Sequence, residues 1–238
     1  MINPLIAIVG PTASGKTALA TALALEFGGE LVSADSKQVY RGMDIGTAKE
    51  LDLPVAQHLV DWKNPGEKVT VAQYQAEAYA CIDDLHQKKI LPILVGGSGL
   101  YAESVTLGYE FSGKGEKVAK PRYRVLEMGI AWEREALKKR AVERTETWLK
   151  QGLLAEIEGL LAAGVSAEWL ETCGMEYRYF TQYLRGEVSY EAALALTNTA
   201  INQFIKRQYT WFRRHPNLVW VKSEEEARQL VRDFLAST

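Results

Sequence analysis

The chain has 238 residues, 47% of them hydrophobic and 24% charged, with a formal net charge of −2 at pH 7. These values predict a folded globular protein with a sizeable core and exclude a disordered, fibrous or collagen-like chain. No apolar run approaches the roughly 20 residues that span a bilayer, and the N-terminus lacks a secretory signal. Two cysteines are too few for a disulfide framework. We therefore expect a cytoplasmic protein without a membrane segment.

The first half of the chain predicts strands that alternate with helices. Short apolar runs, typical of strands buried on both faces, cover residues 5–9 and 91–95, and residues 30–34 (ELVSA) are a further candidate strand. Helical patterns cover residues 17–27 and 71–89, and a shorter helix is expected after Gly96 and Gly97. This alternation predicts an α/β fold in which helices flank a parallel sheet.

The second half is predicted to be mostly helical. Residues 108–122 are rich in Gly and Lys and predict a loop, whereas further strands are expected at residues 125–131 and 218–221. We expect one compact domain. Residues 1–107 form the first part of its core, residues 108–122 form a connecting loop, and residues 123–238 form the remainder of the core with the C-terminal helices.

An octapeptide after the first predicted strand carries a specific chemical signal. Its sequence, GPTASGKT, matches the phosphate-binding pattern G-x-x-x-x-G-K-[ST] and leads into a predicted helix. The glycines allow backbone N–H groups to surround phosphate oxygens, Lys16 adds a positive charge, and the Thr17 hydroxyl can bind Mg²⁺. We therefore expect a P-loop NTPase-like fold whose diphosphate site comprises Gly10, Pro11, Thr12, Ala13, Ser14, Gly15, Lys16 and Thr17.

Two other polar stretches follow predicted strands, at the sheet edge where open α/β folds bind their ligands. One is SADSKQVYRGMDIGTAK, which contains Asp35, and the other is GGSGLY at residues 96–101. From the residues alone, Asp35 has three possible roles: it could bind Mg²⁺ through water, act as a base, or cap a turn.

Charge is distributed unevenly along the chain. Residues 1–110 contain 8 Lys and Arg against 13 Asp and Glu, whereas residues 111–238 contain 20 against 17. Residues 201–214 include four basic side chains and no acidic one, which suits either a solvated helix face or a nucleic-acid contact. Trp211 and Phe212 lie in this run and suit either base stacking or helix packing.

Five stretches, taken in order, resemble the tRNA dimethylallyltransferases. They are GPTASGKT, SADSKQVYRGMDIGTAK, HLVDWKNPGE, LVGGSGLY and KRQYTWFRR, and they extend from residue 10 to residue 214. The resemblance implies transfer of a dimethylallyl group from dimethylallyl diphosphate to N6 of adenosine 37, next to the anticodon in tRNA, with release of diphosphate. Implied with it are Mg²⁺ as cofactor, the tRNA anticodon stem-loop as partner, and a monomeric enzyme.

The resemblance also implies roles for individual residues. Asp35 would accept the proton of the adenine amine, while Lys16 and Thr17 would act on the diphosphate. The implied tRNA-binding residues are Asp35, Ser36, Lys37, Gln38, Ser98, Lys206, Arg207, Gln208 and Arg213.

One departure from the family pattern keeps other activities open. Family members carry a helical insertion that grips tRNA after the GG-[ST]-x-LY motif, and here residues 108–122 take its place. A short middle favours an isopentenyltransferase of free adenine nucleotides as an alternative. A P-loop small-molecule kinase is a second alternative, since residues 114–124 could serve as its basic lid.

The three histidines show no metal-binding spacing. His58 falls in the HLVDWKNPGE stretch, where a structural role is as plausible as a catalytic one. His86 and His215 are expected at the protein surface.

Overall fold

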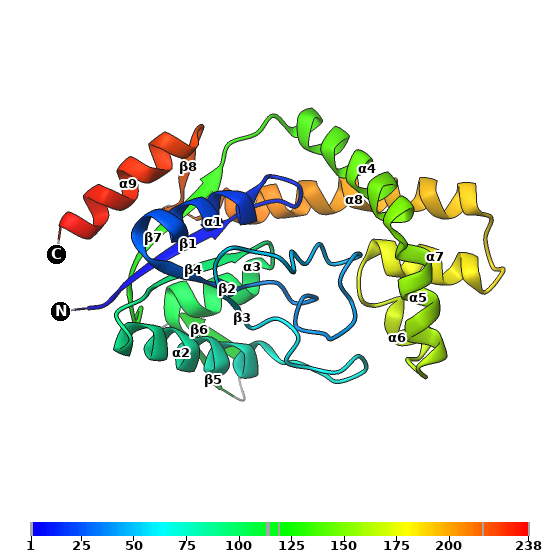
Figure 1. The fold of residues 1–238 in the computed structure, drawn as a ribbon, viewed down its shortest axis with the longest axis horizontal. Helices are drawn as coiled ribbons and strands as arrows, with labels where there is room; N and C mark the ends of the chain where they lie inside the picture. The colour runs from blue at the N-terminus through cyan, green and yellow to red at the C-terminus, as the bar shows by residue number, and fades with distance from the viewer. Residues whose placement is uncertain (1, 113–114, 119, 216, 238) are drawn as a thin grey trace.

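The computed structural model describes residues 2–112, 115–118, 120–215 and 217–237. Its centre is a six-stranded sheet in which every neighbouring pair is parallel (Figure 1). In spatial order its strands are β3 (Gln57–His58), β2 (Gly29–Ser33), β4 (Leu91–Gly96), β1 (Pro4–Val9), β7 (Arg124–Ile130) and β8 (Val219–Val221). No helix of the described residues is long and apolar enough to cross a membrane.

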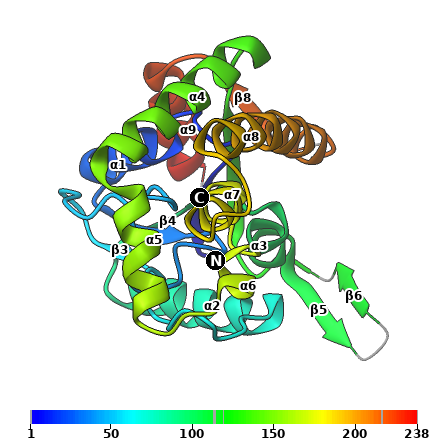
Figure 2. The same cartoon turned by 90° about the vertical axis from the view of Figure 1, so that its right-hand side faces the viewer.

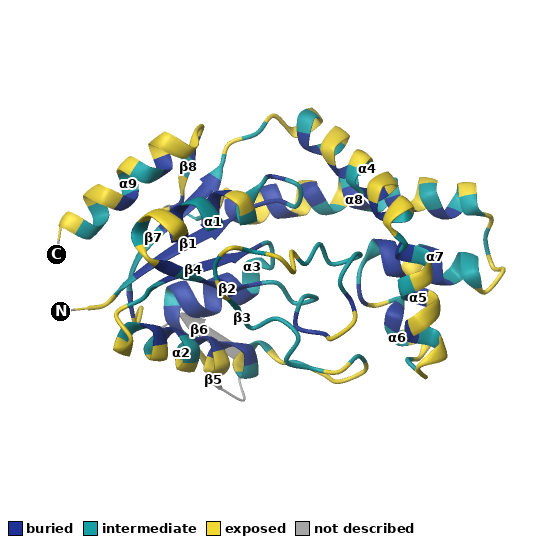
Figure 3. Cartoon of the chain, viewed as in Figure 1, coloured by how far each residue is buried: buried dark blue, intermediate teal, exposed yellow. Residues whose placement is uncertain are grey.

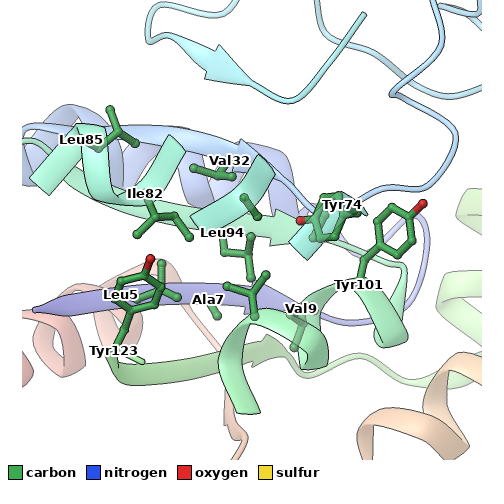
Figure 4. Packing of buried hydrophobic residues seen from close by; sticks show 14 of the residues in the cluster. Leu5, Ala7, Val9, Val32, Tyr74, Ile82, Leu85, Leu94, Tyr101 and Tyr123 are labelled. Atoms are coloured by element: carbon green, nitrogen blue, oxygen red, sulfur yellow. The ribbon is translucent and has the colours of Figure 1, made fainter. Parts of the chain in front are cut away.

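Helices cover both faces of this sheet. Helix α1 (Lys16–Phe27) and helix α9 (Glu224–Ala236) pack on one face, where Leu23 and Val231 share a core cluster with Ile8 of β1. The other face is covered by α2 (Val71–Gln87), by α3 (Gly99–Glu103) and by the single π-helical turn η1 (Ser104–Gly108). Figure 4 shows the second core, in which Ile82 and Leu85 of α2 belong to the same cluster as the β1 side chains.

The remaining helices form a second layer beyond the sheet, on the right of Figure 1. They are α4 (Arg134–Gln151), α5 (Leu153–Ala162), α6 (Ala167–Leu170), α7 (Met175–Leu184) and α8 (Tyr190–Phe212). Helix α8 joins the two parts, because Ala193 packs in the core of the helical layer and Phe212 packs in the core under the sheet. The dark blue stripe along α8 in Figure 3 is the buried side of this connection.

The predicted α/β fold with a parallel sheet and a helical C-terminal part is confirmed. All five expected strands and the two long N-terminal helices are present within one or two residues of their expected bounds. Strand β3 was not expected, because two residues within the irregular stretch 41–68 carry no strand periodicity.

The expectation of a loop at residues 108–122 is wrong. An antiparallel hairpin, β5 (Tyr109–Ser112) and β6 (Gly115–Val118), occupies this stretch and extends away from the body of the molecule (Figure 2). Tyr109, Glu110 and Phe111 alternate aromatic and charged residues, which is the strand period, but the run is too short to stand out among its glycines and lysines. Residues 113, 114 and 119 of the expected loop lie outside the described residues.

Candidate active site

A pocket of about 960 Å³ lies at the carboxyl ends of the central strands. The loops after β1, β2 and β4 form one side of it, and α4 and α8 form the other. The residues of the predicted site that line it are Thr12, Ala13, Ser14, Gly15, Lys16, Thr17, Asp35, Ser36, Lys37, Gln38, Ser98, Arg207 and Gln208. The structure thus brings together residues that are up to 196 positions apart in the chain.

Left-handed backbone shapes the phosphate-binding loop. Ala13 has φ +63° and Gly15 has φ +86°, immediately before α1 begins at Lys16. Left-handed residues that alternate with ordinary ones turn successive N–H groups toward one concave side, which suits an anion at a helix N-terminus. Gly10 and Pro11 do not line the pocket; Gly10 follows β1 with φ +142°, and the Pro11 carbonyl accepts a hydrogen bond from Lys16 Nζ at 2.6 Å.

Side chains from distant parts of the chain hold this loop in place. Gln208 of α8 accepts a hydrogen bond from Thr12 N at 2.9 Å and donates to the Gly97 carbonyl at 2.9 Å. Arg140 Nε donates to the Ala13 carbonyl and Trp132 Nε1 donates to the Ser14 carbonyl, both at 2.9 Å. Gln208, predicted to contact tRNA, therefore also connects two loops of the pocket.

Lys16 is the main positive group beside the loop. Burial lowers its pKa to about 8, the charge of Asp35 opposes this, and the charge of Arg144 adds to it. An anion in the pocket would favour the protonated form, because a nearby opposite charge stabilises the ammonium.

Asp35 lies in a turn directly after β2. Its Oδ1 accepts a hydrogen bond from Lys37 N at 2.8 Å, which is the turn-capping interaction expected of an aspartate there. Its Oδ2 makes no hydrogen bond to the described residues, so one oxygen fixes the turn while the other is available to a ligand. Tyr74 donates to the Ser33 carbonyl at 3.0 Å and stacks on Tyr101 at 4.0 Å, which supports the end of β2 (Figure 4).

The residues after Asp35 differ in how far their side chains are engaged. Ser98 Oγ accepts from Ser36 N at 3.0 Å and donates to Ser36 Oγ at 3.2 Å, which ties the loop after β4 to the loop after β2. Lys37 Nζ donates to the Thr172 carbonyl at 3.0 Å. Gln38 accepts from Ser33 Oγ at 2.9 Å, and its Nε2 donates to two carbonyls within the same loop.

Glu156 of α5 holds the following part of this loop. Its Oε2 accepts hydrogen bonds from the backbone N–H groups of Asp44 at 2.8 Å and Ile45 at 2.7 Å. Its Oε1 accepts from Gly46 N at 3.2 Å and from the Tyr177 hydroxyl at 2.6 Å. One carboxylate thus fixes three consecutive peptide groups, and Gly46 with its successors Thr47 and Ala48 lines the pocket.

Three predicted basic residues lie in the last turns of α8 or directly after it. Lys206, Arg207 and Arg213 are all exposed, and of these Arg207 lines the pocket. Arg213 lies over the Tyr209 ring at 5.3 Å. Their role in binding RNA stays a prediction.

Sequence reasoning missed two arginines of α4. Arg140 and Arg144 both line the pocket. Burial lowers the pKa of Arg144, while Glu176 and Asp35 oppose this. Glu176 is 5% exposed, and burial raises its pKa against the opposing charge of Arg144. The detectable signal was the spacing of the arginines, since residues four apart share a helix face.

The prediction that His215 lies at the surface is wrong. Its side chain is 9% exposed and lies between the buried carboxylates of Glu103 and Glu127, with 3.3 Å between His215 Nδ1 and Glu127 Oε2. His86 is half-buried, and its Nε2 lies 2.9 Å from the Pro4 carbonyl. His58 pairs with Glu30 at 2.6 Å on the outer strands of the sheet.

The oxygen atoms that line the pocket suit an Mg²⁺ ion that is coordinated mainly by substrate phosphates and water. The described residues contain no group of three His, Cys, Asp or Glu side chains that could hold a metal ion. The Thr17 hydroxyl and the Asp35 carboxylate are oxygen donors in the same pocket. Such a set fits Mg²⁺, which takes few protein ligands when substrate phosphates supply the others.

Two family models match this chain. The IPP transferase model matches residues 38–121 and 111–215, and the isopentenyl transferase model matches residues 3–58. The two IPP transferase segments meet at the β5–β6 hairpin, in agreement with a shortened middle at this position.

Known proteins of similar sequence align along nearly the whole chain. tRNA dimethylallyltransferase 2 of Shewanella sediminis is 36% identical over 293 positions, covering 98% of this chain and 97% of that protein. tRNA dimethylallyltransferase 1 of Syntrophus aciditrophicus is 33% identical over 291 positions, covering 94% and 95%. Because both alignments exceed 238 positions, these relatives carry residues that this chain lacks.

Solved structures agree with the sequence comparisons. The tRNA isopentenylpyrophosphate transferase of Bacillus halodurans matches with a TM-score of 0.88 and 28% identity, covering 99% of this chain and 96% of that one. The corresponding enzyme of Staphylococcus epidermidis matches with a TM-score of 0.89 and 26% identity, covering 99% and 100%. Family models, relatives and fold all confirm the resemblance seen in the five sequence stretches, and the chain belongs to the IPP transferase family.

Proposed function

We propose that this enzyme transfers a dimethylallyl group from dimethylallyl diphosphate to N6 of adenosine 37, next to the anticodon in tRNA. The observation that carries the proposal is that one pocket holds both the phosphate-binding loop and the Asp35 turn. Relatives 33% and 36% identical are named tRNA dimethylallyltransferases, which supports the same assignment.

The diphosphate end of the donor suits the P-loop side of the pocket. Backbone N–H groups of residues 13–17 and the Lys16 ammonium would bind the diphosphate oxygens, and the N-terminus of α1 adds its partial positive charge. Arg140 and Arg144 line the same pocket and would add positive charge. This arrangement stabilises negative charge that grows as the bond from the allylic carbon to oxygen breaks.

The acceptor amine suits the Asp35 side. As N6 bonds to the first allylic carbon and the diphosphate leaves, the amine proton passes to the Asp35 carboxylate. Asp35 Oδ2 has no hydrogen-bond partner among the described residues, whereas Oδ1 fixes the turn. The acceptor adenine has to leave its stack to reach this point, which costs only a few kcal/mol in a single-stranded loop.

Thr17 would hold Mg²⁺ together with diphosphate oxygens. When bound, the ion supplies positive charge that stabilises the departing diphosphate. The P-loop residues bind and orient the diphosphate alongside the ion.

An assay of prenyl transfer tests the proposal. Labelled dimethylallyl diphosphate is incubated with an anticodon stem-loop, with AMP, and with ATP plus candidate acceptors. Label in the stem-loop is expected, and Asp35→Ala should reduce turnover by roughly 10²- to 10⁴-fold with nearly unchanged diphosphate affinity. Equal loss of turnover and diphosphate affinity would contradict the role of Asp35.

The AMP arm tests a second candidate function. The IPP transferase model matches this chain in two segments that overlap at residues 111–121, within the β5–β6 hairpin region, and relatives carry residues that this chain lacks. A shorter middle favours a smaller acceptor such as a free adenine nucleotide. Label in AMP alone would indicate that the acceptor is a free nucleotide and not tRNA. Phosphorylation of a small acceptor by ATP would instead indicate a kinase.

A further inference from the structure

Trp211 is an exposed aromatic residue in the last turn of α8. It is 38% exposed, whereas Tyr209 and Phe212 on either side are 9% and 1% exposed. Of the two aromatic residues that the sequence suggested for base stacking, Phe212 therefore belongs to the core and Trp211 remains accessible. The indole lines the active-site pocket and also a neighbouring cavity of about 430 Å³, so it forms a wall between them.

The indole rests against a glycine at the start of α3. A Cβ added at Gly99 would lie 2.3 Å from Trp211 Nε1 and 2.5 Å from its Cδ1, so only glycine permits this approach. Gly99 follows Ser98, whose hydroxyl is bonded to Ser36, the residue after Asp35. The indole is thus placed beside the loops on which the acceptor side of the pocket is built.

A buried network lies beside the indole. Glu103 is 7% exposed, accepts hydrogen bonds from the Tyr109 hydroxyl at 2.6 Å and from His215 Nε2, and lines the neighbouring cavity together with Trp211. Burial would raise the pKa of Glu103, but these hydrogen bonds and the charge of His215 bring it below its ordinary value. Hydrogen bonds to Glu103 and Glu127 raise the pKa of His215 to about 9, so a charged imidazolium lies between two carboxylates at neutral pH.

Exposed arginines flank the indole on both sides. Arg207 lines the active-site pocket and Arg214 lines the neighbouring cavity. A rigid, exposed aromatic ring between cationic side chains is the combination that binds unpaired bases of nucleic acids, since the ring stacks on the base and the cations meet phosphates.

We propose that Trp211 stacks on an unpaired nucleobase of the acceptor RNA next to the adenosine that enters the pocket, and that Glu103 and His215 position the indole for this contact. The proposal rests on the proposed RNA acceptor. The prenyl tail of the donor is a less suitable occupant of this surface, because an allylic group has to be shielded from water and the indole is 38% exposed.

The first test compares affinity for an anticodon stem-loop in the absence of donor. Trp211→Leu should weaken binding by roughly tenfold to a hundredfold, and Trp211→Phe should weaken it less because a smaller ring still stacks. Trp169→Phe is the matched control, since Trp169 is half-buried, packs edge-on against Tyr40 at 4.9 Å and lines neither cavity. Trp169→Phe should bind like the wild type.

The KM for dimethylallyl diphosphate distinguishes a nucleobase from the prenyl tail of the donor as the group that contacts the Trp211 indole. This KM should stay within about twofold of the wild-type value in Trp211→Leu. Unchanged stem-loop affinity in this variant, or an equal rise in the donor KM, would overturn the proposal. Because stem-loop binding is measured without turnover, this outcome is distinct from failure of the wild type to prenylate the stem-loop, which would refute the proposed function instead.

A double-mutant cycle tests the positioning role. Glu103→Gln should weaken stem-loop binding severalfold in the wild-type background and have no further effect in the Trp211→Leu background, because its influence acts through the indole. Equal weakening in both backgrounds would assign Glu103 a general structural role and refute this part of the proposal. His215→Gln should behave like Glu103→Gln.

Discussion

Replacing Glu156 tests whether one carboxylate organises the loop that follows the Asp35 turn. Glu156 accepts three backbone hydrogen bonds from Asp44, Ile45 and Gly46, together with one from the Tyr177 hydroxyl. A hydrogen bond to a charged group contributes roughly 1.5–3 kcal/mol, and the Glu156 side chain is half-buried, so the contributions are discounted and do not add fully. We expect Glu156→Ala to lower the free energy of unfolding by about 3–4 kcal/mol.

Smaller changes at the same cluster should have graded effects. Tyr177→Phe removes a single donor and should lower the free energy of unfolding by about 1 kcal/mol. Glu156→Gln retains one oxygen acceptor but places an amide N–H₂ against backbone donors, so its effect should fall between the other two. Glu158→Gln, an exposed position on the same helix, is the control and should change stability by less than about 0.5 kcal/mol.

Urea unfolding and steady-state kinetics measure these effects separately. The loop lines the pocket, so the stable variants should show a raised KM for the acceptor, whereas diphosphate affinity should be retained because Glu156 does not contact the P-loop. The reasoning that the charged carboxylate fixes this loop would be refuted if Glu156→Ala lowered the free energy of unfolding by less than about 1 kcal/mol. It would also be refuted if Tyr177→Phe lowered the free energy of unfolding as much as Glu156→Ala does.

Three further predictions concern titration and packing. Burial lowers the pKa of Lys16 to about 8, so diphosphate affinity should fall as pH is raised from 7 to 9, and Lys16→Met should abolish this dependence in calorimetric titrations. The folded-state pKa of His215, about 9, is raised above its unfolded value, so its stabilisation is fully present below about pH 6.5 and is lost as pH rises through 9. Between pH 7 and 10, the free energy of unfolding measured in urea should fall by about 1–2 kcal/mol more in the wild type than in His215→Gln, after discounting for partial solvent screening. The control variant His86→Gln should show the same pH dependence as the wild type. Gly46→Ala should destabilise the protein, because its Cβ would lie 2.7 Å from the Tyr177 ring; an unchanged midpoint of thermal unfolding would contradict this.

Local patterns were sufficient for the central sheet and the phosphate-binding loop. Strands β1 and β4 are continuous apolar runs, and GPTASGKT fixes a turn, a charge and a helix start within eight residues. The order of the five motifs also identified the family, which the comparisons confirm. These features depend on residues close together in the chain, so the sequence alone determines them.

The contacts that complete the site depend on tertiary packing. Gln208 reaches Thr12 across 196 positions, Glu156 reaches Ile45 across 111, and His215 lies between two carboxylates that are distant in sequence. No local pattern indicates which polar side chain of a long amphipathic helix will face a loop or a buried carboxylate, because that choice depends on how α4, α5 and α8 pack on the sheet. Sequence therefore determined the chemistry of the donor side, and only the fold decided which side chains hold it in place and which aromatic residue remains exposed beside it.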